Sequence, residues 1–267
     1  MDLSDIKLVV ADMDGTLLNS KHEVSKEFFD LYQRLREKNV YFAAASGRQF
    51  DSIAQKLAPI AKEITIIAEN GGFTVHKDNE IVSNPLRPRH KRLVLKELLE
   101  VDAAQAVLCT KHAAYLMPSS QPFLEQLKEY YTKFNFIEDL NAFEGEVMKI
   151  AVYHPRGSEE HIYPFMKHFE GELKVKVSGK FWVDVSHRDA NKGHALEIIQ
   201  KEMKISMAET MVIGDYNNDL EMLARADYSF AMANAHENVM AAARFSTSSN
   251  DDRGVEKVLQ TLLDSKS

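Results

Sequence analysis

Short apolar runs alternate with helical patterns near both ends of the chain. The first run, residues 6–11, is nearly continuous and rich in β-branched residues, which is typical of a strand buried on both faces. Apolar side chains spaced three and four apart predict a helix over 25–38, with Ser25 as its N-cap. Further strand patterns lie at 40–45, 64–68, 210–213 and 228–232. This alternation predicts an α/β fold built on a doubly wound parallel sheet.

The middle of the chain has a different pattern. Residues 83–90 carry two prolines and three basic residues, which is typical of a linker. Beyond it, strand and helix patterns no longer alternate regularly, and we expect antiparallel strands with helices on one face of their sheet. The expected helices are 94–99, 123–134 and 159–169, and the expected strands are 106–110, 113–117, 147–153, 173–177 and 181–185. We therefore predict a core domain of two parts, 1–82 and 188–267, interrupted by an inserted α+β domain at 83–187.

Composition and charge limit which partners the protein can bind and where in the cell it is expected. The chain has 267 residues, a net charge of −7 and no basic tract, which argues against nucleic acid or anionic membrane as a partner. Cys109 is the single cysteine, so an internal disulfide and a cysteine-based zinc site are excluded. We find neither a signal peptide pattern nor an apolar run near 20 residues. We expect a cytoplasmic protein, and both a monomer and a homodimer remain open.

Two carboxylates follow the first strand directly. Asp12 and Asp14 are two residues apart, so on an extended backbone their side chains point the same way. In open α/β sheets, ligands bind at the carboxyl ends of the strands, where this pair lies. Two like charges facing one crevice repel each other, and a divalent cation with oxygen ligands offsets that repulsion.

Other polar groups also lie at strand ends or helix starts. Ser46-Gly47-Arg48 follows the second strand, where a hydroxyl and free backbone N–H groups can bind an anion. Glu-Asn-Gly-Gly at 69–72 follows the third strand; it resembles a turn found in Cof-type hydrolases, and an ordinary glycine turn explains it equally well. Lys192 opens a helix after the insertion, and the next strand ends in GDYNND at 214–219.

The order of these motifs resembles the haloacid dehalogenase superfamily. DMDGT at 12–16, Ser46, Lys192 and the Asp215–Asp219 segment match its four motifs, and the resemblance spans the whole chain. The insertion between the second and third motifs resembles the class IIB cap of Cof-type hydrolases. The resemblance implies a Rossmann-like core with a mobile cap. It also implies a Mg²⁺-dependent phosphatase of small phosphorylated metabolites, often sugar phosphates, which acts through an aspartyl-phosphate.

The same resemblance implies a role for each motif residue. Asp12 is the expected nucleophile, and Asp14 is the expected acid and base. The implied Mg²⁺ ligands are Asp12, the backbone carbonyl of Asp14, and Asp215, with Asp219 supporting them. The expected phosphate-binding residues are Met13, Ser46, Gly47, Lys192 and Asn218.

Two alternative functions remain open at this point. Some class IIB members transfer phosphoryl between sugar hydroxyls, so a phosphosugar mutase is an alternative enzyme. A catalytically idle regulator that binds a ligand on the same scaffold is the alternative from another class. The intact Asp12, Asp14, Lys192 and Asp215 argue against the regulator, and no motif names the substrate.

Overall fold

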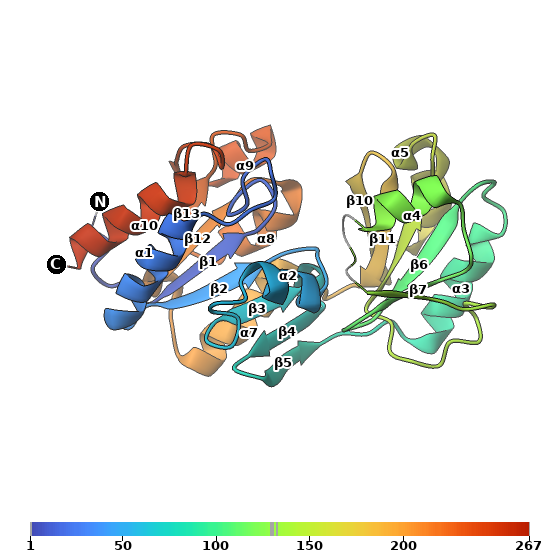
Figure 1. Ribbon diagram of the computed structural model, residues 1–267, viewed down its shortest axis with the longest axis horizontal. Coiled ribbons are helices and arrows are strands. Elements are labelled where there is room, and N and C mark those ends of the chain that lie inside the picture. The colour runs from blue at the N-terminus through green and yellow to red at the C-terminus, as the bar shows by residue number, and fades with distance from the viewer. Residues whose placement is uncertain (1, 129–130, 132, 267) are drawn as a thin grey trace. The chain divides into compact units, whose positions relative to one another are not determined.

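A computed structural model describes residues 2–128, 131 and 133–266 (Figure 1). The chain forms two compact units, which we call the core unit and the cap unit. The core unit consists of Met1–Gly47, Ile53–Val82 and Asn191–Ser267, and the cap unit consists of Arg48–Ser52 and Ser83–Ala190. The core unit is therefore built from chain segments on both sides of the long insertion.

The core unit contains an eight-stranded sheet within the described residues, in the order β14-β13-β12-β1-β2-β3-β4-β5. The strands from β14 to β3 are parallel, and β4 runs antiparallel to β3. The strands are β1 Leu8–Asp12, β2 Tyr41–Ala45, β3 Thr65–Ala68, β4 Phe73–His76, β5 Asn79–Ser83, β12 Thr210–Gly214, β13 Tyr228–Ala231 and β14 Phe245–Ser246. All five residues of β1 are buried because β1 is central and covered on both faces, which explains its continuous apolar sequence.

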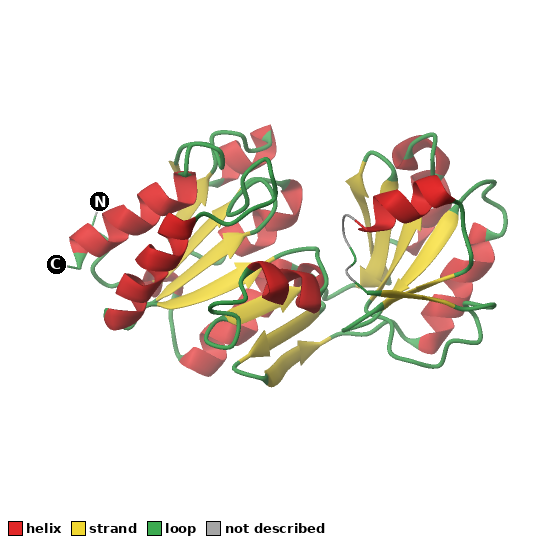
Figure 2. Cartoon of the chain, viewed as in Figure 1, coloured by secondary structure: helices red, strands yellow, loops and turns green. Residues whose placement is uncertain are grey.

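Helices cover both faces of the core sheet, as Figures 1 and 2 show. They are α1 Lys26–Glu37, α2 Phe50–Lys56, α7 Lys192–Met203, α8 Leu220–Leu223, α9 Glu237–Ala242 and α10 Gly254–Ser265, with 3₁₀ turns η1 Glu69–Gly71, η3 Met207–Glu209 and η4 Asn217–Asp219. α1 begins as predicted, because the Ser25 Oγ accepts a hydrogen bond from the Phe28 N–H at 3.0 Å. α1 and α10 lie side by side in front of the sheet, and α7 lies behind it. In the described part of the chain, no helix has the length and apolar character needed to cross a bilayer.

The cap unit contains a six-stranded sheet within the described residues, in the order β10-β11-β9-β6-β7-β8. Its neighbouring strands are antiparallel except for β7 and β8, which are parallel. The strands are β6 Gln105–Cys109, β7 Ala114–Leu116, β8 Phe134–Phe136, β9 Lys149–Tyr153, β10 Leu173–Gly179 and β11 Trp182–His187. The helical segments are α3 Pro88–Leu98, α4 Gln121–Lys128, α5 Ser158–His161, α6 Tyr163–Met166 and η2 Lys167–Phe169.

The prediction of helices on only one face of the cap sheet was wrong. Ile150 and Val152 of β9 belong to an apolar cluster that also contains residues of α3 and α6. Ala151 and Tyr153 belong to a second cluster, which contains Phe123 of α4. Side chains alternate between the faces of a strand, so these clusters lie on opposite faces. β9 is buried at every position for this reason.

Several element boundaries also differ from the predictions. The expected linker at 83–90 is helical from Pro88 onward, because proline suits the first turn of a helix. The expected helix 159–169 is split, since Pro164 has no N–H to continue the first segment. The expected helix 123–134 ends at Lys128 where it is described, Phe134 lies in β8, and residues 129, 130 and 132 lie outside the described residues.

Candidate active site

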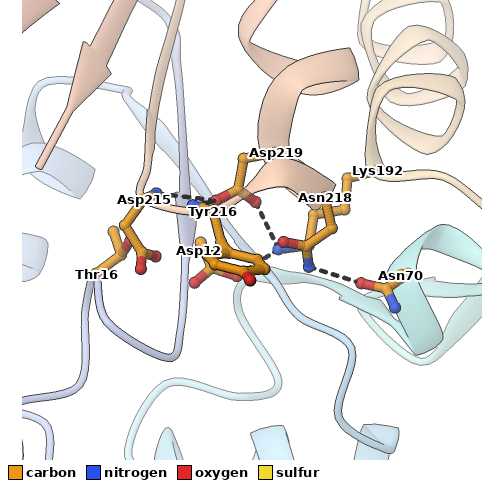
Figure 3. Close-up of polar contacts among 8 residues, drawn as sticks. All are labelled: Asp12, Thr16, Asn70, Lys192, Asp215, Tyr216, Asn218 and Asp219. Atoms are coloured by element: carbon orange, nitrogen blue, oxygen red, sulfur yellow. Dashed lines mark hydrogen bonds and ion pairs between the residues drawn. The ribbon is translucent and has the colours of Figure 1, made fainter. Parts of the chain in front are cut away.

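Four charged side chains meet at the carboxyl end of the core sheet (Figure 3). Asp12 is the last residue of β1, and Asp215 directly follows β12. Lys192 is the first residue of α7, and Asp219 ends η4. The parallel pairing of β1 with β12 brings these residues together across the inserted segment.

Lys192 is fully buried between two carboxylates. Its Nζ forms an ion pair with the Asp12 Oδ1 and a second one with the Asp219 Oδ1 at 2.7 Å. The Asn191 Oδ1 caps the helix by accepting a hydrogen bond from the His194 N–H at 2.7 Å, which fixes where α7 begins. A buried ammonium needs such partners, because its desolvation is costly without them.

Asp219 has hydrogen bonds at both carboxylate oxygens. Besides the contact with Lys192, its Oδ2 accepts from the backbone N–H of Asp215 at 2.9 Å and of Tyr216 at 3.1 Å. Gly214 leaves room for this carboxylate, since a Cβ at position 214 would lie 2.6 Å from the Asp219 Oδ2. Asp219 therefore holds Lys192 and the start of the Asp215 loop in place.

Asp12, Asp215 and Asp219 could together hold a metal ion. Among the described residues, they form the group of buried carboxylates whose ligand atoms all lie within 4.8 Å of one another. The Asp215 Oδ1 accepts a hydrogen bond from the Thr16 Oγ1 at 2.8 Å, which orients it. Gly15 has φ +76° and a Cβ there would lie 2.3 Å from the Asp215 Oδ2, so both the backbone and the carboxylate require glycine.

Burial dominates the electrostatics of this cluster. Burial raises the pKa of Asp12 well above its usual range, and the other carboxylates add to this while Lys192 opposes it. Burial and the neighbouring Asp219 raise the pKa of Asp215 to about 6. Burial alone would lower the pKa of Lys192, but Asp12 and Asp219 raise it, so the ammonium stays charged. One ammonium cannot neutralise three carboxylates, so their oxygen donors and excess negative charge fit a divalent cation.

The other predicted residues lie around this cluster. Met13 is fully buried, and the Asp14 side chain is 42% exposed, with its Oδ1 3.6 Å from the His22 Nδ1. The Asp14 carboxylate is thus outside the buried group, and its predicted metal contact uses the backbone carbonyl instead. Ser46 is buried and, with Gly47, follows β2, which pairs with β1 through Asp12 and Ala45.

The structure adds residues to which sequence reasoning gave no role. Thr16, in the DMDGT motif, orients Asp215, and Tyr216 supplies an N–H to Asp219. The Asn70 Oδ1 accepts a hydrogen bond from the Asn218 Nδ2 at 2.9 Å. The available signals were the hydroxyl within DMDGT and the Glu-Asn-Gly-Gly turn, but neither reveals its partner in the sequence.

Comparison with known proteins places this chain in a family. A model of haloacid dehalogenase-like hydrolases matches residues 9–259. The 5-amino-6-(5-phospho-D-ribitylamino)uracil phosphatase YbjI of Escherichia coli is 31% identical over 264 residues, covering 97% of this chain and 96% of that protein.

Solved structures agree on the fold. The crystal structure of SMU.1108c from Streptococcus mutans has a TM-score of 0.88 at 26% identity and covers 97% of this chain and 99% of that one. The fold is also that of the haloacid dehalogenase subclass IIB sugar phosphatase BT4131, with a TM-score of 0.83 at 20% identity over 96% of this chain and 98% of that one. The predicted α/β core with an inserted domain is confirmed. The chain belongs to the haloacid dehalogenase-like hydrolase family, as the order of its motifs predicted.

Proposed function

We propose that this protein is a Mg²⁺-dependent phosphatase that hydrolyses small phosphorylated metabolites through an aspartyl-phosphate on Asp12. The observation that carries the proposal is the meeting of Asp12 with the buried Lys192 and with Asp215 at the carboxyl end of the sheet. Phosphoryl transfer needs a nucleophile and positive charge in one place, and this cluster supplies both. Membership of a hydrolase family in which YbjI is named a phosphatase supports the same reaction.

The proposed reaction has two steps. In the first, a carboxylate oxygen of Asp12 bonds to phosphorus while the bond from phosphorus to the ester oxygen breaks, and Asp14 gives its proton to that oxygen. In the second, Asp14 takes a proton from water, the water oxygen bonds to phosphorus, and phosphate leaves as the Asp12 carboxylate is regenerated. The side chain of Asp14 suits this exchange because it is partly exposed, whereas Asp12 is buried against Lys192.

The remaining residues would hold the phosphoryl group and the metal. Ser46, the backbone N–H groups of Met13 and Gly47, the Lys192 ammonium and the Asn218 amide are the proposed phosphoryl-binding groups. The proposed Mg²⁺ ligands are Asp12, the backbone carbonyl of Asp14, and Asp215. Asp219 would orient the loop that carries Asp215. When bound, the ion would offset negative charge on the transferring group.

Sugar phosphates and sugar-alcohol phosphates are the substrate class we propose. The E. coli relative is named for a substrate that carries its phosphate on a ribityl chain. The test is a screen of phosphorylated metabolites with released phosphate as the readout, including that compound, hexose phosphates and sugar bisphosphates. Phosphate release supports the phosphatase. Isomerised sugar phosphate without phosphate release would identify a mutase, and binding without any turnover would identify a regulator.

Activity should depend on a divalent cation. After exhaustive chelation we expect the rate of phosphate release to fall about 10²-fold or more, and added Mg²⁺ should restore it. The reason is that a bound cation stabilises the charge of the transition state by several kcal/mol. Asp215→Asn should raise the Mg²⁺ concentration needed for half-maximal rate or abolish activity. Asp30→Asn, on the exposed face of α1, is the matched control and should leave the Mg²⁺ dependence unchanged. Full turnover by the chelated enzyme would contradict the metal assignment.

A further inference from the structure

The turn at Glu69–Gly72 has an unusual backbone. Glu69, Asn70 and Gly71 have φ values of +50°, +54° and +89°, so three successive residues lie in the left-handed region. Outside glycine this conformation costs free energy, although asparagine tolerates it better than most residues. Strain of this kind persists where the surroundings determine the conformation, and it is often found at functional sites. Contacts on two sides of the turn hold it in this conformation.

One side of the turn faces the residues that follow β2. The backbone N–H of Asn70 donates to the Ser46 carbonyl at 2.9 Å. The Asn70 amide lies against Gly47, since a Cβ added there would be 3.1 Å from the Asn70 Nδ2 and 3.2 Å from its Oδ1. The absence of a side chain at position 47 is therefore what lets the Asn70 amide approach.

The other side of the turn faces the second part of the core unit. The Asn70 Oδ1 accepts from the Asn218 Nδ2 at 2.9 Å, as Figure 3 shows. Gly71 packs on the backbone of the Asn191 N-cap, where a Cβ would lie 2.3 Å from the Asn191 carbonyl oxygen. Lys192, the first residue of α7, comes directly after that cap. The turn thus contacts Ser46, Gly47 and Asn218 and adjoins Lys192.

We infer that Asn70 is a positioning residue for the phosphoryl-binding groups, an inference that rests on the proposed function. The Asn70 amide holds the Asn218 amide through a hydrogen bond and lies against Gly47, so it sets how these two groups are placed. Donors held in place before the substrate arrives need no reorganisation during the reaction, so a residue that only orients them still raises the rate. On this inference, the Asn70 side chain, on the turn between β3 and β4, raises the rate of the reaction.

A double-mutant cycle tests the inference. Asn70→Gly removes the amide and keeps a residue that adopts φ +54° without strain. We expect kcat/KM to fall roughly tenfold, the scale of one hydrogen bond that orients a binding group. The dissociation constant for inorganic phosphate, measured by titration with Mg²⁺ present, should rise. Because Asn70 acts through Asn218, the Asn70→Gly/Asn218→Ala double variant should be no worse than Asn218→Ala alone.

The matched control is Asn39→Gly. Asn39 is also a left-handed asparagine, with φ +57°, and lies exposed after α1, away from the site. It makes the same change of residue at the same kind of backbone position without removing a contact to Asn218, so it should keep full kcat/KM and phosphate affinity. Gly47→Ala checks the same amide from its other side: the added methyl would crowd the Asn70 amide, so it should lower kcat/KM more in the native background than in Asn70→Gly. Gly47→Ala in the native background retains Asn70, so it can be measured even if Asn70→Gly folds poorly.

The outcomes separate the inference from the proposed function. Native kcat/KM and phosphate affinity in Asn70→Gly, or effects that multiply in the double variant, would overturn the positioning role. If the unaltered enzyme released no phosphate from any substrate in the screen, the proposed function would fail. The phosphate titrations of the unaltered protein and Asn70→Gly would still decide whether Asn70 organises an anion site.

Discussion

Asp12→Asn should release no phosphate from any substrate. An amide is a very poor nucleophile, so no phospho-enzyme can form. The fold should survive, because Lys192 keeps its 2.7 Å ion pair with Asp219 and the asparagine has nearly the same shape as the aspartate. The measurement is phosphate release from both a sugar phosphate and nitrophenyl phosphate, with melting temperature as the check on folding.

Asp14→Asn should separate the two steps instead of abolishing both. A sugar hydroxyl is a poor leaving group and needs a proton from Asp14, whereas nitrophenolate needs it little. This variant should therefore be phosphorylated by nitrophenyl phosphate and then hydrolyse the aspartyl-phosphate slowly for want of a base. The expected time course is a burst of about one equivalent of nitrophenol per enzyme, followed by almost no further release.

Each of these variants is the control for the other. The phosphorylated Asp14→Asn protein should show a mass increment that hydroxylamine removes, and Asp12→Asn should show none. A nitrophenol burst that persists in Asp12→Asn and disappears in Asp14→Asn would mean that the nucleophile is Asp14.

Lys192→Ala should lower kcat by about 10²–10³-fold, the effect expected when one preorganised donor to the transferring group is removed, roughly 3–4 kcal/mol. The variant also leaves the Asp12 and Asp219 carboxylates without their buried cation. Breaking a buried pair in this way is itself destabilising, by about 3–5 kcal/mol. Activity should therefore be measured well below the melting temperature of the variant, with added Mg²⁺.

Lys192→Arg should rescue little activity. The Lys192 side chain has no exposed surface, and a planar guanidinium fork does not fit the place of a compact ammonium. The matched control is Lys201→Ala, on the same helix, whose side chain is 72% exposed and pairs with Glu197. It should change neither rate nor stability by much, since exposed ion pairs contribute about 0–1 kcal/mol. Unaltered kcat in Lys192→Ala would show that Lys192 has no catalytic role.

The core fold and the meeting of Asp12, Lys192 and Asp215 at the strand ends could be predicted from the sequence because their signals are local. A buried strand that ends in Asp12 shows as an apolar run before a carboxylate, and the same holds for Asp215. Strand ends of a parallel sheet meet at one edge, so residues far apart in sequence could be placed together. The helical start at Lys192 was also visible, although its complete burial between two carboxylates was not.

Features that depend on distant partners could not be predicted. Asn70 and Asn218 are 148 residues apart, and the turn that holds Asn70 has the same composition as an ordinary glycine turn. The second covered face of the cap sheet was missed for a related reason. The burial of Ala151 and Tyr153 becomes apparent only when α4 is seen to lie over them. Periodicity shows which face of an element is apolar, but it does not show what covers that face.

The position of β1 has a consequence for how the chain folds during synthesis. β1 pairs with β2 on one side and with β12 on the other, and Leu8 lies opposite Thr210. Until the ribosome has made β12, one edge of this apolar strand has no partner, and unpaired strand edges favour aggregation. At typical synthesis rates of about 5–20 residues per second, the roughly 200 intervening residues leave that edge open for some 10–40 seconds. During that interval the edge of β1 that will later pair with β12 is open to wrong pairing with other chains.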